Sequence, residues 1–281
     1  MRIDSLHIHP LKGARAVDLE RARIEPRGLE GDRRWLATTP DGAFLTQRDC
    51  PALARIAASP VEGGLHLSTD DGEKCEAMID LRAERRRVTI WRDEVEALHM
   101  DAKTDAWLSD KIGRPARLFY MDDAARRMTS ARWGAPGPVS FADGYPVLVA
   151  NAASLAALNE AIAEDGGGQV VMARFRPNIV LSGADPWAED CWRVLRLGEA
   201  VIELVKPCDR CVVTTKDQKT GESLGKEPLK TLARLRRSAD PRVSGVLFGW
   251  NAVMRRAGGV AVGDEVEIME ARKEGWALAS S

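Results

Sequence analysis

The sequence has no long apolar run. Nowhere in its 281 residues is there a stretch approaching the ~20 consecutive apolar residues that a helix needs to cross a bilayer. The first residues, 1–5, do not lead into the apolar core of a secretory signal. We therefore expect a cytoplasmic protein with no membrane partner.

An excess of charge of either sign is also missing. Lys and Arg number 41 and Asp and Glu number 42, so no global field attracts nucleic acid or an anionic membrane. We expect no nucleic-acid partner. Any bound anion must be held by local groups.

Cysteines are few and histidines fewer. The five cysteines are odd in number, and only Cys208 and Cys211 lie close together in the chain, which argues against a disulfide framework. The sequence contains no G-x-x-x-x-G-K-[ST] loop, no G-x-G-x-x-G fingerprint and no G-x-S-x-G elbow. These absences remove the simplest ATPase, dinucleotide-binding and hydrolase interpretations.

The first part of the chain is predicted to be β-rich. In about the first hundred residues apolar positions alternate and Asp-Gly pairs mark turns, a pattern typical of hairpins. Later segments show helical spacing as well as strands, so the second half is expected to mix the two. The predicted hairpins are 34–38 with 43–46, 65–68 with 75–79, and 88–91 with 95–100; the helices are 102–112, 154–163 and 229–235; the later strands are 201–205 and 260–268.

The most informative segment is 207–215, directly after the predicted strand 201–205. Cys211 follows Arg210 and lies near Lys206, and cationic neighbours favour the thiolate, the form of cysteine that binds metals and attacks electrophiles. A soft thiolate suits a soft metal. Function is therefore expected at this cysteine.

Two other interpretations of the cysteine pair stay open. Cys208 and Cys211 could be half of a zinc site, although the other ligands are hard to find in the sequence. They could also be a redox pair, but such a pair normally opens a helix. The β-branched residues 212–215 predict a strand there instead.

Several basic residues are candidates for an anion site. Arg174, Arg176 and Asn178 precede an apolar strand; arginine forks onto phosphate, and asparagine can pair with the edge of a heterocycle. Lys12 and Arg33 stand beside glycines, where a ligand can approach the backbone. Solvated surface cations are the alternative in each case. Segment 141–146 predicts a pocket rim with the Tyr145 hydroxyl facing a ligand, or only a turn.

Taken together, these segments resemble the MOSC domain family. The resemblance runs nearly end to end and depends on seven motifs in order. They are His9-Pro10-Leu11-Lys12, Gly31-Asp32-Arg33-Arg34-Trp35, Thr46-Gln47-Arg48, Phe141-Ala142-Asp143-Gly144-Tyr145-Pro146, Phe175-Arg176-Pro177-Asn178-Ile179, Cys208 through Thr215, and Leu247-Phe248-Gly249-Trp250-Asn251.

The resemblance implies an α+β, β-rich fold, with an N-terminal β-barrel-like domain packed on a MOSC β-barrel with flanking helices. The implied domains are residues 1–115 and 116–275. It also implies a molybdenum-molybdopterin cofactor whose metal is bound by Cys211, the catalytic residue, while Cys208 is a bystander. The implied cofactor-binding residues are Lys12, Arg33, Asp143, Gly144, Tyr145, Arg176, Asn178, Asp209 and Arg210.

Within the family, the chain resembles amidoxime-reducing proteins, which implies a molybdenum-dependent reductase acting on small N-hydroxylated compounds by oxygen-atom transfer. No cysteine cluster for an iron-sulfur centre follows Cys211. Electrons are therefore expected from a separate protein of the ferredoxin, flavin reductase or cytochrome type. Two alternatives remain: a sulfur carrier or sulfurtransferase using a persulfide on Cys211, and a non-catalytic cofactor carrier.

Overall fold

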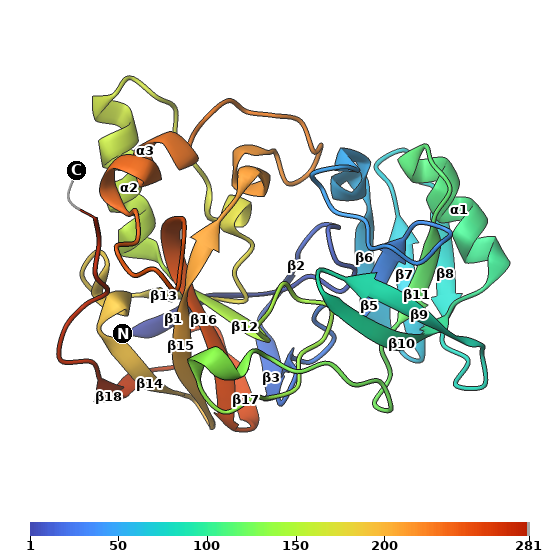
Figure 1. The fold of residues 1–281 in the computed structure, drawn as a ribbon, viewed down its shortest axis with the longest axis horizontal. Coiled ribbons are helices and arrows are strands. Elements are labelled where there is room, and N and C mark those ends of the chain that lie inside the picture. The colour runs from blue at the N-terminus through green and yellow to red at the C-terminus, as the bar shows by residue number, and fades with distance from the viewer. Residues whose placement is uncertain (280–281) are drawn as a thin grey trace.

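An eight-stranded sheet forms the larger part of the computed structural model, which describes residues 1–279. One edge of this sheet returns to the other, because Val266 N donates to Met1 O at 3.0 Å, and the sheet is curled into a barrel-like layer (Figure 1). In spatial order its strands are β18 (Val266–Ala271), β14 (Trp192–Leu197), β15 (Ala200–Arg210), β16 (Val246–Arg256), β12 (Val147–Asn151), β13 (Ile179–Ser182), β1 (Arg2–Ile8) and β2 (Val17–Leu19).

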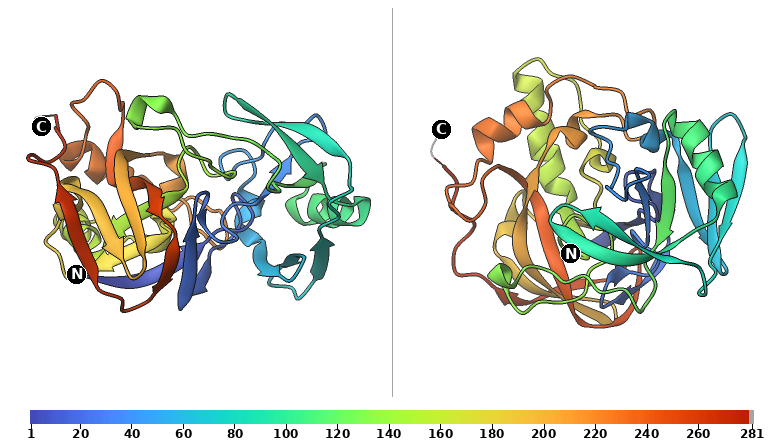
Figure 2. Two further views of the ribbon diagram at one scale, coloured as in Figure 1. Left: turned by 90° about the horizontal axis from the view of Figure 1, so that it is seen from below. Right: turned by 45° about the vertical axis from the view of Figure 1, so that its right-hand side comes forward.

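Three smaller sheets make up the rest. The first is β17 (Gly258–Ala261), β3 (Arg21–Glu25) and β4 (Gly28–Leu29); the second is β5 (Trp35–Thr38), β11 (Arg117–Tyr120), β10 (Asp93–His99) and β9 (Arg85–Ile90); the third is β6 (Ala57–Val61), β7 (Gly64–Ser68) and β8 (Lys74–Met78). The last two sheets and helix α1 (Ala102–Ile112) form a separate body beside the large sheet (Figure 2).

Helices are few and cover edges and ends. Beside α1, the structure has α2 (Ala152–Glu164), α3 (Leu229–Leu235) and five short 3-10 helices. The latter are η1 (Pro51–Arg55), η2 (Ala131–Trp133), η3 (Met172–Phe175), η4 (Ala188–Asp190) and η5 (Val212–Thr215). The predicted α+β, β-rich fold class is confirmed. None of the helices in residues 1–279 is both long and apolar enough to pass through a membrane.

Local sequence explains the elements that were predicted well. Asp101 caps α1 by accepting from Thr104 N at 2.7 Å, as expected of an acidic N-cap. The second and third hairpins are present as β7–β8 and β9–β10. The first is reduced to β5 and isolated bridges at Ala43 and Phe44.

Four clusters of buried apolar residues support the two bodies within residues 1–279. One lies on the large sheet and includes Ile3, Leu195 and Trp250, and another packs the small sheets on α1. The other two lie around Phe119 and around Phe175. The strands do not follow the predicted division at residue 115: β1 pairs with β13 in the large sheet, and β11 pairs with β5 and β10. The division at residue 115 therefore stays a prediction. A strand before it, β1, pairs with a strand after it, and a strand after it, β11, pairs with two strands before it.

Predicted strand 260–268 is wrong as one element. The chain forms β17 up to Ala261 and resumes as β18 at Val266. Asp264 makes the break, because its carboxylate accepts from Ala261 N at 2.8 Å and its amide donates to Ala261 O. This local turn competes with strand pairing, as aspartate often does.

We expect Gly28→Ala to destabilise the protein far more than Gly72→Ala. Both glycines have positive φ, +104° and +87°, so both substitutions carry about 1–2 kcal/mol of left-handed strain. A Cβ on Gly28 would also lie 2.2 Å from Pro146 O, whereas one on Gly72 meets nothing within 4 Å; the clash adds about 2 kcal/mol. Urea unfolding of both variants tests this, and equal losses would contradict the packing argument.

Candidate functional site

One pocket at the junction of the two bodies collects all ten predicted site residues. They come from the loops after β1 and β4, the segment before β12, the segment between η3 and β13, and the end of β15. The predicted residues that line it are Lys12, Arg33, Asp143, Gly144, Tyr145, Arg176, Asn178, Asp209, Arg210 and Cys211. Residues more than a hundred positions apart are thus brought to one cavity.

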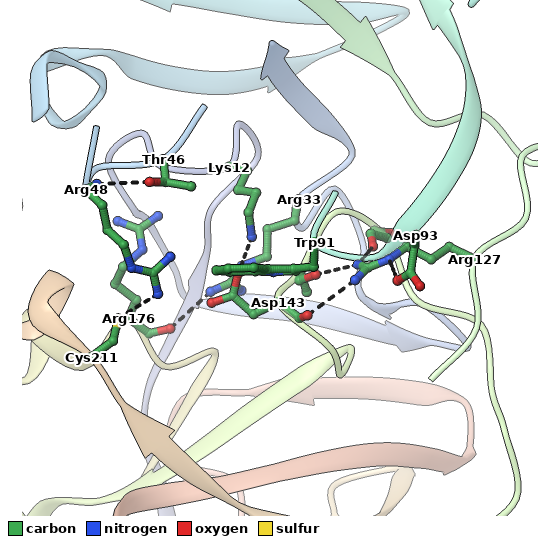
Figure 3. A network of polar contacts seen from close by, with 12 residues as sticks. Lys12, Arg33, Thr46, Arg48, Trp91, Asp93, Arg127, Asp143, Arg176 and Cys211 are labelled. Atoms are coloured by element: carbon green, nitrogen blue, oxygen red, sulfur yellow. Dashed lines mark hydrogen bonds and ion pairs between the residues drawn. The ribbon is translucent and has the colours of Figure 1, made fainter. Parts of the chain in front are cut away.

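The Cys211 thiol lies against an arginine from the other body. Arg48 Nη2 donates to Cys211 Sγ at 3.0 Å, and Figure 3 shows the two side chains pointing toward each other. No other hydrogen bond to the Arg48 guanidinium is present among residues 1–279. A cation donating to sulfur stabilises negative charge on it.

The sequence predicted that Arg210 and Lys206 act on the Cys211 thiol, but both bond to other groups. Arg210 Nη1 donates to Cys208 Sγ at 2.7 Å, and Lys206 Nζ pairs with Asp209 at 2.5 Å. Side chains two positions apart share one side of a strand, so Arg210, at the end of β15, lies on the side of Cys208. Burial raises the pKa of the Cys208 thiol against the opposing effect of Arg210.

Residues 212–215 form the 3-10 helix η5 and not the predicted strand. The hydroxyl of Thr214 donates to Cys211 O and that of Thr215 donates to Val212 O, each at 2.8 Å. These hydroxyls bond three residues back and close a turn that β-branched propensity alone does not predict. Cys211 is therefore the residue from which a short helix begins, and its thiol lies at the junction of strand and turn.

Lys12 and Asp143 form an ion pair at the centre of the pocket. Burial lowers the pKa of Lys12, and Asp143 opposes that shift. For Asp143, burial acts to raise the pKa, but Lys12, Arg33 and Arg48 outweigh it and the net pKa is lowered. Asp143 is surrounded by the walls of the pocket, but its side chain is 72% exposed because it faces the open cavity. It is a carboxylate among cations.

Arg33 and Arg176 are fixed by short contacts, and both have positive φ. Arg33 Nη1 donates to Asp32 at 2.7 Å and to Asn178 Oδ1 at 3.1 Å. Arg176 donates to Gln218 at 3.0 Å and to Ala14 O at 2.8 Å. Held this way, both guanidinium groups keep their positions without a ligand.

The carboxamide of Asn178 makes three side-chain hydrogen bonds. Its Oδ1 accepts from Leu148 N at 3.0 Å and from Arg33, while Nδ2 donates one hydrogen to His7 O at 3.1 Å. The predicted contact with a heterocycle edge stays a prediction, and only the second N–H of the amide could make it. As placed, Asn178 positions Arg33 and the strands beside it.

The pocket has a strong excess of positive charge. Six cationic side chains line it against two carboxylates, those of Asp143 and Asp209. Burial and the nearby Arg33 lower the pKa of Arg176, and burial with Arg176 and Arg33 lowers that of the buried His9. Mutual repulsion of cations in a partly enclosed cavity favours a bound anion. The cationic residues are Lys12, Arg33, Arg48, Arg174, Arg176 and Arg210.

Three lining residues carry buried polar atoms without partners in residues 1–279. These are Tyr145 Oη, Gln47 Oε1 and Arg210 Nε. Burial raises the pKa of Tyr145 to about 12, so its hydroxyl is neutral and can donate. Beside it, a Cβ added at Gly144 would meet nothing within 4 Å. The pocket thus has open space and unused hydrogen-bonding groups for a polar ligand.

Sequence reasoning missed three residues that organise the pocket. Arg48 was part of a recognised motif but had no assigned role. Trp91 Nε1 donates to Asp143 Oδ1 at 3.3 Å, and Arg127 donates to Asp93 and to the carbonyl of Asp143, at 2.8 and 3.3 Å. A tryptophan in a two-residue hairpin turn, where glycine or asparagine is usual, was the available signal for Trp91.

The geometry gives the zinc alternative for the cysteine pair no support and removes one objection to the redox pair. No group of three or more His, Cys, Asp and Glu side chains suited to a metal ion occurs within residues 1–279, which leaves the zinc half-site without further ligands. Cys208 and Cys211 are free thiols with different arginine partners. Cys211 does open a short helix, contrary to the argument made against a redox pair.

The fold and pocket define a two-part, β-rich protein with a cysteine in a cavity lined by cationic side chains at the junction. The profile of the MOSC domain matches residues 136–267, and that of the MOSC N-terminal beta barrel domain matches residues 1–115. The chain therefore belongs to the MOSC domain family.

Named relatives cover most of the chain. It is 29% identical to mitochondrial amidoxime-reducing component 1 of Danio rerio, over 94% of this chain and 83% of the relative. The Homo sapiens protein of that name is also 29% identical, over 95% and 82%. A molybdenum cofactor sulfurase of Oryza sativa subsp. japonica is 29% identical over 90% of this chain but 33% of its own length. These relatives support a function related to the molybdenum cofactor.

We expect Tyr145→Phe to leave stability at neutral pH unchanged or up to ~1 kcal/mol higher, because it removes a buried hydroxyl without a partner. Folded Tyr145 keeps its proton up to about pH 12, whereas the unfolded chain releases it near pH ~10. Stability of the parent therefore falls as pH rises through this window. Unfolding at pH 8 and pH 11 should show a smaller alkaline loss in Tyr145→Phe; an equal loss would exclude the buried phenol.

Proposed function

We propose that this protein is a molybdenum-cofactor-binding oxidoreductase that reduces small N-hydroxylated compounds by oxygen-atom transfer. The observation that carries the proposal is the hydrogen bond of Arg48 to Cys211 Sγ at 3.0 Å, inside a cavity lined by an excess of cations. A thiolate held this way is a suitable ligand for a soft metal, and the surrounding cations suit the phosphate of a pterin cofactor.

The residues present fit such a cofactor. Lys12, Arg33 and Arg176 would hold its phosphate, and Cys211 would bind the metal. Asp143 and Tyr145 offer an acceptor and a neutral donor for a polar ring system, while Gly144 leaves room for it. Asn178 positions Arg33, Arg210 donates to Cys208, and Lys206 pairs with Asp209.

When bound, the molybdenum cofactor would supply the oxygen-atom chemistry, since cofactors carry the difficult step. The protein itself positions the groups that hold the cofactor and sets the charge of the cavity. Arg48 donates to the Cys211 sulfur, and the Lys12–Asp143 pair and Arg33 set the charge of the cavity. The neutral Tyr145 hydroxyl can donate to a ligand oxygen or nitrogen throughout the physiological pH range.

The names of the relatives support the proposed substrate class and a partner protein. Their name describes an amidoxime-reducing component, which favours N-hydroxylated small molecules and an assembly with more than one protein. We propose that electrons come from a separate ferredoxin, flavin reductase or cytochrome-type protein, and that the protein is cytoplasmic.

The test is molybdenum and pterin content after expression with molybdate in a host that makes the cofactor. Cys211→Ala is compared with the parent, and Cys208→Ala is the matched control because both thiols line the same pocket and bond to arginines. We expect near-stoichiometric molybdenum in the parent and in Cys208→Ala, and a loss of at least tenfold in Cys211→Ala.

Other outcomes distinguish the alternatives. Equal molybdenum in all three proteins would exclude Cys211 as the ligand. A persulfide on Cys211 detected by mass spectrometry, without molybdenum, would favour sulfur transfer, which the sulfurase relatives also make a candidate. Bound molybdenum that no electron donor reduces would favour a cofactor carrier.

A further inference from the structure

We propose that Trp91, at the tip of the β9–β10 hairpin, is a wall of the pocket that packs on the flat heterocycle of the bound pterin cofactor and slows its loss. This inference rests on the proposed function and adds a residue that neither the motifs nor the family resemblance assign. It depends on three independent observations: the backbone of Trp91, its contacts and its exposure.

The backbone at Trp91 is strained. Its φ is +56°, in a two-residue turn that joins Ile90 to Asp93. Hairpin turns with positive φ normally use glycine or asparagine, and a bulky residue there costs conformational energy. Residues held in such conformations cluster at ligand sites. Glycine would adopt this positive φ at a lower energy, so the turn itself does not explain why an indole stands here.

The indole connects two sides of the pocket. Its Nε1 donates to Asp143 Oδ1 at 3.3 Å, and Asp143 pairs with Lys12. The Arg48 guanidinium lies 4.9 Å from the centre of its ring and donates to Cys211. Figure 3 shows the ring edge-on across the pocket, near Lys12 and Asp143. The hairpin tip is thus linked to both the metal position and the central ion pair.

Much of the indole remains exposed in spite of these contacts. Phe44 packs on it with ring centres 4.9 Å apart, yet Trp91 is 42% exposed. It lines a neighbouring cavity, which borders the main pocket and shares Asp143, Gly144 and Tyr145 with it. A rigid aromatic surface beside a cationic phosphate site is how proteins hold flat, phosphorylated heterocycles, by stacking on the ring.

The experiment measures how fast the purified holoprotein loses its pterin and molybdenum during repeated desalting, for the parent, Trp91→Gly and Trp91→Phe. Trp91→Gly removes the wall but suits the positive φ, so the unfolding midpoint of the cofactor-free protein should stay close to that of the parent. We expect cofactor loss about tenfold faster in Trp91→Gly and close to the parental rate in Trp91→Phe, which keeps an aromatic ring.

The matched control is Trp133→Ala, which removes another indole under an arginine, with Arg242 4.7 Å from its ring centre, away from the pocket lining. It should lose cofactor at the parental rate. Parental retention in Trp91→Gly would overturn this inference and leave the proposed function intact, as would equally fast loss in Trp91→Phe and Trp91→Gly. A parent that holds no pterin when made in a competent host would overturn both.

Discussion

The carboxamide of Asn178 is the interaction on which the pocket depends. Its side chain bonds to the backbone of β1 at His7, to the backbone of β12 at Leu148 and to the guanidinium of Arg33. Its own backbone also pairs with those two residues, each bond at 2.8 Å. A buried amide with three side-chain hydrogen bonds is costly to rearrange. One side chain therefore fixes where the N-terminal strand enters the large sheet and where Arg33 stands.

That arrangement brings like charges together, and the fold offsets their repulsion only in part. Asp32 pairs with Arg33 and Asp143 with Lys12, but Arg176 is held by neutral oxygens of Gln218 and Ala14. The lowered pKa of Arg176 and of His9 records this repulsion together with burial. An anion in the cavity would relieve it, so the same contacts that hold these cations together favour a phosphate-bearing ligand.

The sequence predicted local features well and partners across the pocket poorly. Alternation and turn residues gave β7–β8 and β9–β10, and the acidic cap and helical spacing gave α1. The ten site residues meet in one cavity because each lies near a strand end or in a turn. The Arg48 contact to Cys211 joins residues 163 positions apart, and no local pattern encodes it. The strand predicted for η5 failed because two threonine hydroxyls replaced strand pairing with bonds to their own turn.

The two pocket cysteines show why this cross-pocket contact matters. Cys208 bonds to Arg210 from its own strand, so its surroundings exist wherever β15 folds. The only guanidinium on Cys211 comes, among residues 1–279, from the segment that precedes η1 in the other body. The guanidinium contact to the sulfur proposed to bind the metal therefore depends on the two bodies being packed together. Trp91 adds a second link of the same kind, through Arg48 on one side and Asp143 on the other. The metal site proposed at Cys211 is therefore complete only when the N-terminal half is docked against the large sheet.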